Sequence, residues 1–236
     1  MNNALTRKIF GLLCIAGVAG YQARATSVFV SEVGVSPSIV VDINTSIYNG
    51  STSSPYNGGA YAGLNELMVG GTMVGGVQTG GTLTYGFCID PFHYSSTAPL
   101  EFQYVPLADA PLGKFPHPMG VSEATEIEKL WTYVYSDHMT PLQAAGLQLA
   151  IWEVVGTGNG FSVTGPGSVV TQAADYRAYV TDHFSAIPNA NLIGLTGPGQ
   201  DYVVALVPDR AKTAALLGLS FMGLAAARRR FKTKAV

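Results

Sequence analysis

The stretch "TPLQAAGLQLAIWEVV", residues 140–155, decides the fold class, because it predicts a long helix in a chain that is otherwise rich in strand patterns. Thr140, Pro141 and Gln143 stand at the N-cap, N1 and N3 positions of a capping box. The helix should therefore begin at Pro141, continue through the apolar residues that follow, and stop at the glycine-containing loop 156–160.

Two more helical patterns lie on either side of this helix. Thr125 with Glu128 three residues later is a second capping-box pattern, and a helix is predicted over "EIEKLWTYVYSDH", residues 126–138. A third amphipathic helix is predicted from helical spacing further on, and its positions are Ala173, Arg177, Val180, Phe184 and Ile187.

Strand patterns fill the chain before and after the helices. Alternating β-branched and aromatic residues predict strands at 27–33, 38–48, 83–90, 100–107, 191–196 and 201–207. The glycine and proline pattern predicts two short strands with turns at 67–81, a loop at 49–60 and a connection at 108–120. This order predicts an α+β domain, either a β-sandwich or a β-barrel-like fold with a helical insert.

The composition excludes several function classes. The span 26–206, about 180 residues, is long enough for one domain with a substantial core. Most of the chain carries few charges and the basic residues concentrate at its two ends, so nothing indicates a nucleic-acid partner. The four scattered histidines and the single cysteine outside the N-terminal segment have no metal-ligand spacing. We therefore expect neither a metal nor another cofactor.

The N-terminal segment has the three parts of a secretory signal peptide. Arg7 and Lys8 precede an apolar run over 9–19, and "ARA" at 23–25 places small residues where a signal peptidase reads them. Cleavage is expected before Thr26, so residues 1–25, including a first cysteine inside the apolar run, should be absent from the mature protein.

The C-terminal segment, residues 207–236, also has three parts. It begins with "VPD", which is Val207, Pro208 and Asp209. An uncharged run over 213–227 follows, and as a helix it would be roughly 22 Å long, short for a hydrocarbon core of about 30 Å. A basic tail that starts with Arg228, Arg229 and Arg230 comes next and should stay on the cytoplasmic side of a membrane.

This tripartite tail resembles the C-terminal sorting signal of exosortase substrates, the PEP-CTERM group and its VPDSG variety in Gram-negative bacteria. The resemblance implies a transient inner-membrane anchor. It also implies a membrane enzyme that cuts at the short motif and passes the protein outward to the cell surface or extracellular matrix.

Two polar residues in the central domain call for an explanation. Gln148 lies among apolar residues on the central helix, and a buried amide without hydrogen-bond partners costs a few kcal/mol. Cys88, in "TYGFCIDPFHY" at 84–94, is left without an intramolecular disulfide partner once the signal is removed. Such a cysteine is buried and inert, paired with another chain, or chemically special.

Together, "GFCID" at 86–90 and "QLAIW" at 148–152 resemble the thioester domains of bacterial surface adhesins. In those domains a strand cysteine is joined to the glutamine of a QxAIW segment. The resemblance implies a bond between Cys88 and Gln148 that an amine of a surface protein or a polysaccharide hydroxyl can open, which would attach the target covalently. The reaction is single-use, so the protein is not expected to be an enzyme.

The chemistry requires a specific environment. The fold has to hold sulfur and carbonyl in attack geometry, and backbone N–H groups would stabilise the oxyanion. Aromatic side chains are expected to shield the bond from water, and the candidates are Tyr85, Phe87, Tyr133 and Trp152.

Two alternatives stay open from the residues alone. The first is a non-covalent structural or exopolysaccharide-associated surface protein in which Cys88 is buried and unreactive. The second is a cysteine hydrolase or transferase with Cys88 as its nucleophile. Its base would be one of the four histidines, and its orienting acid Asp90 or Asp137; the histidines are His93, His117, His138 and His183.

Overall fold

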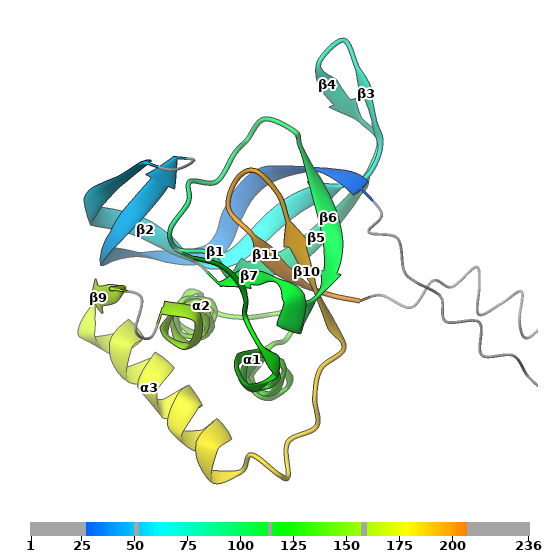
Figure 1. Ribbon diagram of the computed structural model, residues 1–236. Coiled ribbons are helices and arrows are strands. Elements are labelled where there is room, and N and C mark those ends of the chain that lie inside the picture. The colour runs from blue at the N-terminus through cyan, green and yellow to red at the C-terminus, as the bar shows by residue number, and fades with distance from the viewer. Residues whose placement is uncertain (1–26, 50–51, 113–114, 157–159, 207–236) are drawn as a thin grey trace, which may run out of the picture.

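The computed structural model describes residues 27–49, 52–112, 115–156 and 160–206, which form antiparallel strands and three α-helices (Figure 1). The main strands are β1 (Ser27–Asn49), β2 (Thr52–Val69), β5 (Thr82–Cys88), β6 (Leu100–Pro106), β9 (Ser162–Thr164), β10 (Leu192–Thr196) and β11 (Tyr202–Ala205). Two small hairpins are β3 (Thr72–Val74) with β4 (Val77–Thr79), and β7 (Pro111–Leu112) with β8 (Phe115–Pro118). A 3-10 turn (Leu107–Asp109) and the helices α1 (Val121–Val134), α2 (Pro141–Gly156) and α3 (Gly167–Asp182) complete the described elements.

The main sheet closes on itself. Its strand order is β2-β5-β11-β10-β6-β1-β9, and β1 pairs with β2 as well as with β6. Six strands therefore form a ring, and β9 is attached outside it to β1. A closed ring satisfies backbone groups that an open sheet would leave at its edges. The predicted β-rich α+β fold is confirmed at this level.

The long β1–β2 hairpin differs from the prediction. Residues 49–60 were expected to be a loop, but most of them belong to β2, which pairs with β1 from Asn49 opposite Thr52 onward. The expected break between strands 27–33 and 38–48 is instead a pair of register irregularities within one strand. Gly59 shows why glycine in this segment did not mean a turn: a Cβ at this position would lie 3.0 Å from Cγ1 of Val40 on the facing strand.

The helices begin and end where capping and packing allow. The capping box at α2 is confirmed, because the Thr140 N–H donates to Gln143 Oε1 at 2.9 Å and the Gln143 N–H donates to Thr140 Oγ1 at 3.3 Å. The second capping box is wrong, since α1 already begins at Val121 and Thr125 lies inside it. The third helix also begins earlier than its first predicted position and ends at Asp182.

Helix α2 lies between the sheet and the other helices, which gather on one side of the strands (Figure 1). It contacts β1, β2 and β5 as well as α1 and α3, and from Ala144 to Gly156 every residue except Glu153 is buried. This packing explains why a polar residue in the middle of α2 is removed from water. Among the described residues, no helix is long and apolar enough to cross a membrane.

Candidate functional site

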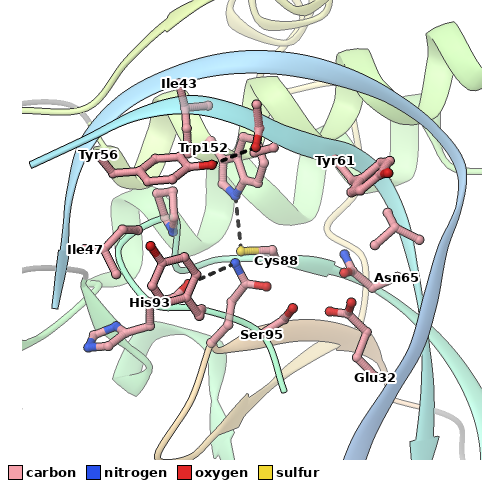
Figure 2. Close-up of a pocket in the computed structure, with 16 residues that line it drawn as sticks. Glu32, Ile43, Ile47, Tyr56, Tyr61, Asn65, Cys88, His93, Ser95 and Trp152 are labelled. Atoms are coloured by element: carbon pink, nitrogen blue, oxygen red, sulfur yellow. Dashed lines mark hydrogen bonds between the residues drawn. The ribbon is translucent and has the colours of Figure 1, made fainter. Parts of the chain in front are cut away.

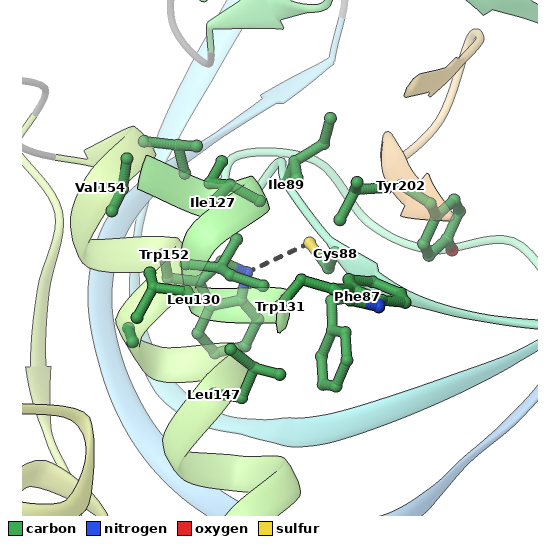
Figure 3. Close-up of a cluster of buried hydrophobic side chains, with 14 of the residues drawn as sticks. Phe87, Cys88, Ile89, Ile127, Leu130, Trp131, Leu147, Trp152, Val154 and Tyr202 are labelled. Carbon is green, nitrogen blue, oxygen red and sulfur yellow. Dashed lines mark hydrogen bonds between the residues drawn. The ribbon is translucent and has the colours of Figure 1, made fainter. Parts of the chain in front are cut away.

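Cys88 is the last residue of β5 and stands opposite Tyr202 of β11. The close approach of these two strands requires Gly86, where a Cβ would lie 2.6 Å from the carbonyl oxygen of Val203. Cys88 is buried and is a free thiol in the structure. It therefore lies where the ring of strands meets the helical layer, within the apolar cluster that Figure 3 shows.

The side chain of Gln148 reaches Cys88 from α2, so the structure brings the two predicted residues together. The Cys88 N–H donates to Gln148 Oε1 at 2.9 Å, and Gln148 Nε2 donates to the Cys88 carbonyl oxygen at 2.7 Å. Gln148 is fully buried. Its carboxamide thus pairs with the backbone of Cys88 as a neighbouring strand would, and this pairing satisfies both polar groups in the core.

A second donor contacts the same amide oxygen. Asn65 of β2, itself buried, donates from Nδ2 to Gln148 Oε1 at 3.4 Å. Two N–H groups, one from Asn65 and one from the Cys88 backbone, therefore converge on this oxygen. Donors in this arrangement stabilise negative charge on a carbonyl oxygen when a nucleophile adds to its carbon.

The sulfur of Cys88 accepts two hydrogen bonds. Trp152 Nε1 donates to Sγ at 3.2 Å (Figures 2 and 3). The backbone N–H of Asp90 donates to the same sulfur at 3.2 Å. Burial nevertheless raises the pKa of the Cys88 thiol well above its usual value, and the nearby Asp90 carboxylate raises it further. Cys88 is consequently a protonated thiol at neutral pH and a weak nucleophile toward free substrates.

Asp90 also interacts with two other titratable groups, His93 and Asp201. His93 Nδ1 and Asp90 Oδ2 are 2.6 Å apart, and the hydrogen bond with this carboxylate raises the pKa of His93. Burial, followed by the charge of Asp90, raises the pKa of Asp201 to about 7. Of the four histidines considered for a hydrolase, His93 is thus the one that pairs with Asp90 in the structure. No hydrogen bond between His93 and Cys88 is recorded among the described residues.

The predicted aromatic neighbours divide into two groups. Trp152 contacts the sulfur directly, and Phe87 is fully buried beside Trp131 at a ring distance of 5.5 Å. Tyr85 is 40% exposed and lines a separate cavity. Tyr133 of α1 is 42% exposed and stacks on Tyr179 of α3. We therefore assign the sulfur environment to Trp152 and Phe87 and not to the two tyrosines.

A cavity of about 240 Å³ opens beside Cys88 (Figure 2). Cys88, Trp152 and Asn65 contribute to its lining, together with Glu32 and several tyrosines. Neither Asn65 nor Glu32 was a candidate in the sequence analysis. They belong to β2 and β1, far from the motifs in sequence, and only the register of the hairpin brings them to the site.

Other sequence-based expectations fall outside this site or outside the described residues. The predicted signal peptide and the sorting segment with Val207, Pro208, Asp209 and Arg228–Arg230 lie outside the described residues. Within the described part of the chain, no group of three or more histidine, cysteine or acidic side chains is placed to hold a metal. No family model, curated protein or solved structure matches this chain.

The buried carboxyl of Asp201 predicts a pH dependence of stability. Its pKa rises from the ordinary value near 4 to about 7 on folding, so the folded state binds a proton that the unfolded state has lost. The free energy of unfolding should therefore fall as pH rises from 4 to 7, and the raised pKa of His93 lowers it further at pH values above 6.5. Urea titrations at pH 5 and pH 8 should show this fall in the wild type and a smaller one in Asp201→Asn.

The matched control is Asp182→Asn, at an exposed position at the end of α3. It should keep the wild-type difference between the two pH values. An Asp201→Asn protein with the full wild-type dependence would contradict the assignment of a raised pKa to this carboxyl.

Proposed function

We propose that residues 26–206 form an exported thioester module, in which the sulfur of Cys88 is joined to the side-chain carbonyl of Gln148 and the bond is later opened by a target nucleophile. The observation that carries the proposal is the convergence of two donors, the Cys88 N–H and Asn65 Nδ2, on Gln148 Oε1. Two donors on this oxygen support acyl chemistry at the carbonyl carbon of Gln148. An amide that only satisfied the backbone of Cys88 would not need the second donor.

Bond formation is balanced without a cofactor. Sγ of Cys88 adds to Cδ of Gln148, the Cδ–Nε2 bond breaks, and the thiol proton leaves with the nitrogen as ammonia. The hydrogen bonds that fix the amide against Cys88 hold it in place before reaction, and such positioning is worth about 7–11 kcal/mol of barrier in favourable cases. A buried thiol that is a weak intermolecular nucleophile fits this single intramolecular event better than it fits turnover.

The surroundings of the sulfur fit its role as a leaving group. Trp152 Nε1 and the Asp90 N–H both donate to Sγ, so they would stabilise charge that develops on sulfur when a nucleophile opens the bond. The cavity beside Cys88 gives a target a way to approach. The product would be a target linked through the carbonyl of residue 148 and a released Cys88 thiol.

The ends of the chain extend the proposal to location. With a signal peptide at 1–25 and a sorting tail at 207–236, the module would cross the inner membrane of a Gram-negative bacterium. The tail would anchor it there transiently, and an exosortase-type enzyme would release it to the cell surface or matrix. Its role there would be adhesion or matrix cross-linking. The finer fold assignment, a thioester-type barrel with a helical insert, belongs to the same proposal.

One observation favours the alternative, a non-covalent structural or exopolysaccharide-associated surface protein. Burial and the raised pKa of Cys88 are also the properties of an inert core cysteine, and the Gln148 amide satisfies the strand backbone without any reaction.

Methylamine treatment separates the two functions. A thioester module incorporates one methylamine at residue 148, found by peptide mapping, and exposes a titratable Cys88 thiol. An inert core gives no adduct at residue 148 on freshly purified protein, which would overturn the proposal.

A further inference from the structure

Glu32 places a carboxylate on the inner side of the strand ring, where apolar residues are otherwise paired. In the β1–β2 register, Glu32 stands opposite Leu67, and the pair Val30 and Val69 lies two residues away. Leu67, Val30 and Val69 are all buried. Directly opposed residues of an antiparallel pair share a face, so the side chain of Glu32 faces inward with them. A register irregularity between Glu32 and Gly34 follows at once, and such bulges re-aim side chains.

The recorded side-chain hydrogen bond of this carboxylate links it to the cysteine strand. Tyr202 donates from its hydroxyl to Glu32 Oε2 at 3.0 Å, and Tyr202 is the residue opposite Cys88 in the β5–β11 ladder. Burial raises the pKa of Tyr202, so this hydroxyl remains a donor at all physiological pH values. The carboxylate is thereby held on the lining of the cavity that Cys88 also lines (Figure 2).

The charge of Glu32 is not balanced by a lysine or an arginine in the cavity lining. None of its lining residues, all of which the structure describes, is lysine or arginine. Its other ionisable lining groups are Cys88, His93, which is engaged by Asp90, and tyrosines. Glu32 is half-buried, and the hydroxyl of Tyr202 uses only part of the hydrogen-bonding capacity of its carboxylate.

Aromatic rings occupy other parts of the lining. Tyr56 and Tyr94 meet edge to face at a ring distance of 6.2 Å, and both Tyr94 and Tyr61 are 65% exposed. Tyrosine faces attract ammonium groups, and a carboxylate on the lining of the same cavity adds to that attraction. A neutral sugar hydroxyl gains nothing comparable from the charge of Glu32.

We propose that Glu32 is a specificity-determining residue that selects a primary ammonium group as the nucleophile for the bond between Cys88 and Gln148. This inference rests on the proposed function. The ammonium binds beside Glu32, loses one proton to solvent and attacks the carbonyl carbon as the free amine. The new C–N bond forms as the C–S bond breaks. The second of its three hydrogens passes to the sulfur, which restores the Cys88 thiol, and the third stays on the amide.

The test compares a charged and a neutral nucleophile on the same protein. At pH 7 methylamine is protonated and hydroxylamine is neutral, and both open thioesters. Glu32→Gln should lower the second-order rate constant for methylamine about tenfold and leave that for hydroxylamine within twofold. Glu101→Gln, at an exposed position on β6, is the matched control and should change neither rate.

Two further arms identify the source of the ammonium. A lysine derivative blocked at its backbone ends represents a protein side chain, and putrescine represents a free polyamine. Each should react about tenfold faster with wild type than with Glu32→Gln. Whichever of the two compounds reacts faster with the wild type identifies the source of the ammonium, a protein side chain or a free polyamine.

The outcomes separate this inference from the proposed function. If hydroxylamine opens the wild-type bond, the thioester stands. If Glu32→Gln then lowers the rate constants for both nucleophiles equally, or lowers neither, the role of Glu32 is overturned. Wild-type protein that neither nucleophile modifies overturns the thioester itself, and the role of Glu32 falls with it.

Discussion

Replacing Gln148 with alanine in a Cys88→Ala background, where the amide cannot form a thioester, should lower the free energy of unfolding of the domain by about 3–5 kcal/mol, because two buried backbone groups lose their hydrogen-bond partner and a cavity is left. In the structure, the amide accepts from the Cys88 N–H and donates to the Cys88 carbonyl oxygen, and both groups lie in the core. Both lose this partner when the amide is removed. Urea denaturation of the purified domain, followed by tryptophan fluorescence, measures the change.

Gln103→Ala is the matched control, since Gln103 is exposed on β6 and its side chain makes no hydrogen bond to the residues that the structure describes. It should change the free energy of unfolding by no more than about 0.5 kcal/mol. A Gln148→Ala protein as stable as this control would show that the amide does not hold the end of β5 against α2.

Replacing Cys88 with alanine should abolish covalent capture of methylamine while leaving the domain folded. The two hydrogen bonds to Gln148 come from the backbone of residue 88 and survive the change. Beyond the loss of the thioester cross-link, which both variants share, the Trp152 indole N–H loses its sulfur acceptor, so a further destabilisation of about 1–3 kcal/mol is expected, which is smaller than that caused by removing the Gln148 amide. Mass spectrometry after methylamine treatment reads out capture, and circular dichroism reads out folding.

The contrast between the two variants is informative. Both should lack the methylamine adduct, but the loss of stability should be greater in Gln148→Ala. An adduct at residue 148 in folded Cys88→Ala protein would mean that the glutamine is modified without the cysteine, and would contradict the thioester account.

The sequence predicted correctly those elements whose ends are set by interactions between neighbouring residues. The capping box at Thr140 and Gln143 places the start of α2 correctly, because its hydrogen bonds are made within four residues. The Gly-rich segment 67–81 forms the β3–β4 hairpin as expected, with Gly75 and Gly76 between its strands. The segment 49–60 was mispredicted because Gly59 serves a close contact with Val40 of the facing strand, and the facing strand is not visible from local pattern.

The candidate site was predicted in the same uneven way. Cys88 and Gln148 could be paired because their motifs together resemble a known domain, and the structure places them in contact through the Cys88 backbone. Asn65 and Glu32 carry no local signal, since an asparagine or a glutamate on a strand is usually at the surface. Their inward direction follows from the register of the long β1–β2 hairpin, which depends on long-range pairing.

The structure also bears on the hydrolase alternative. Asp90 connects the two groups that such an enzyme would use, with its N–H on the Cys88 sulfur and its carboxylate on His93. A turnover nucleophile needs a thiolate, however, and both burial and the charge of Asp90 keep Cys88 protonated. The same protonated, buried thiol suits a bond that forms once and is then held.

The most direct test of the central claim is the intact mass of the freshly purified domain, residues 26–206, before any treatment. The thioester account predicts a mass one ammonia below the sequence value, which rises by one methylamine on treatment. A mass equal to the sequence value, unchanged by methylamine, would contradict it and would leave Cys88 and Gln148 as a structural pair that joins β5 to α2.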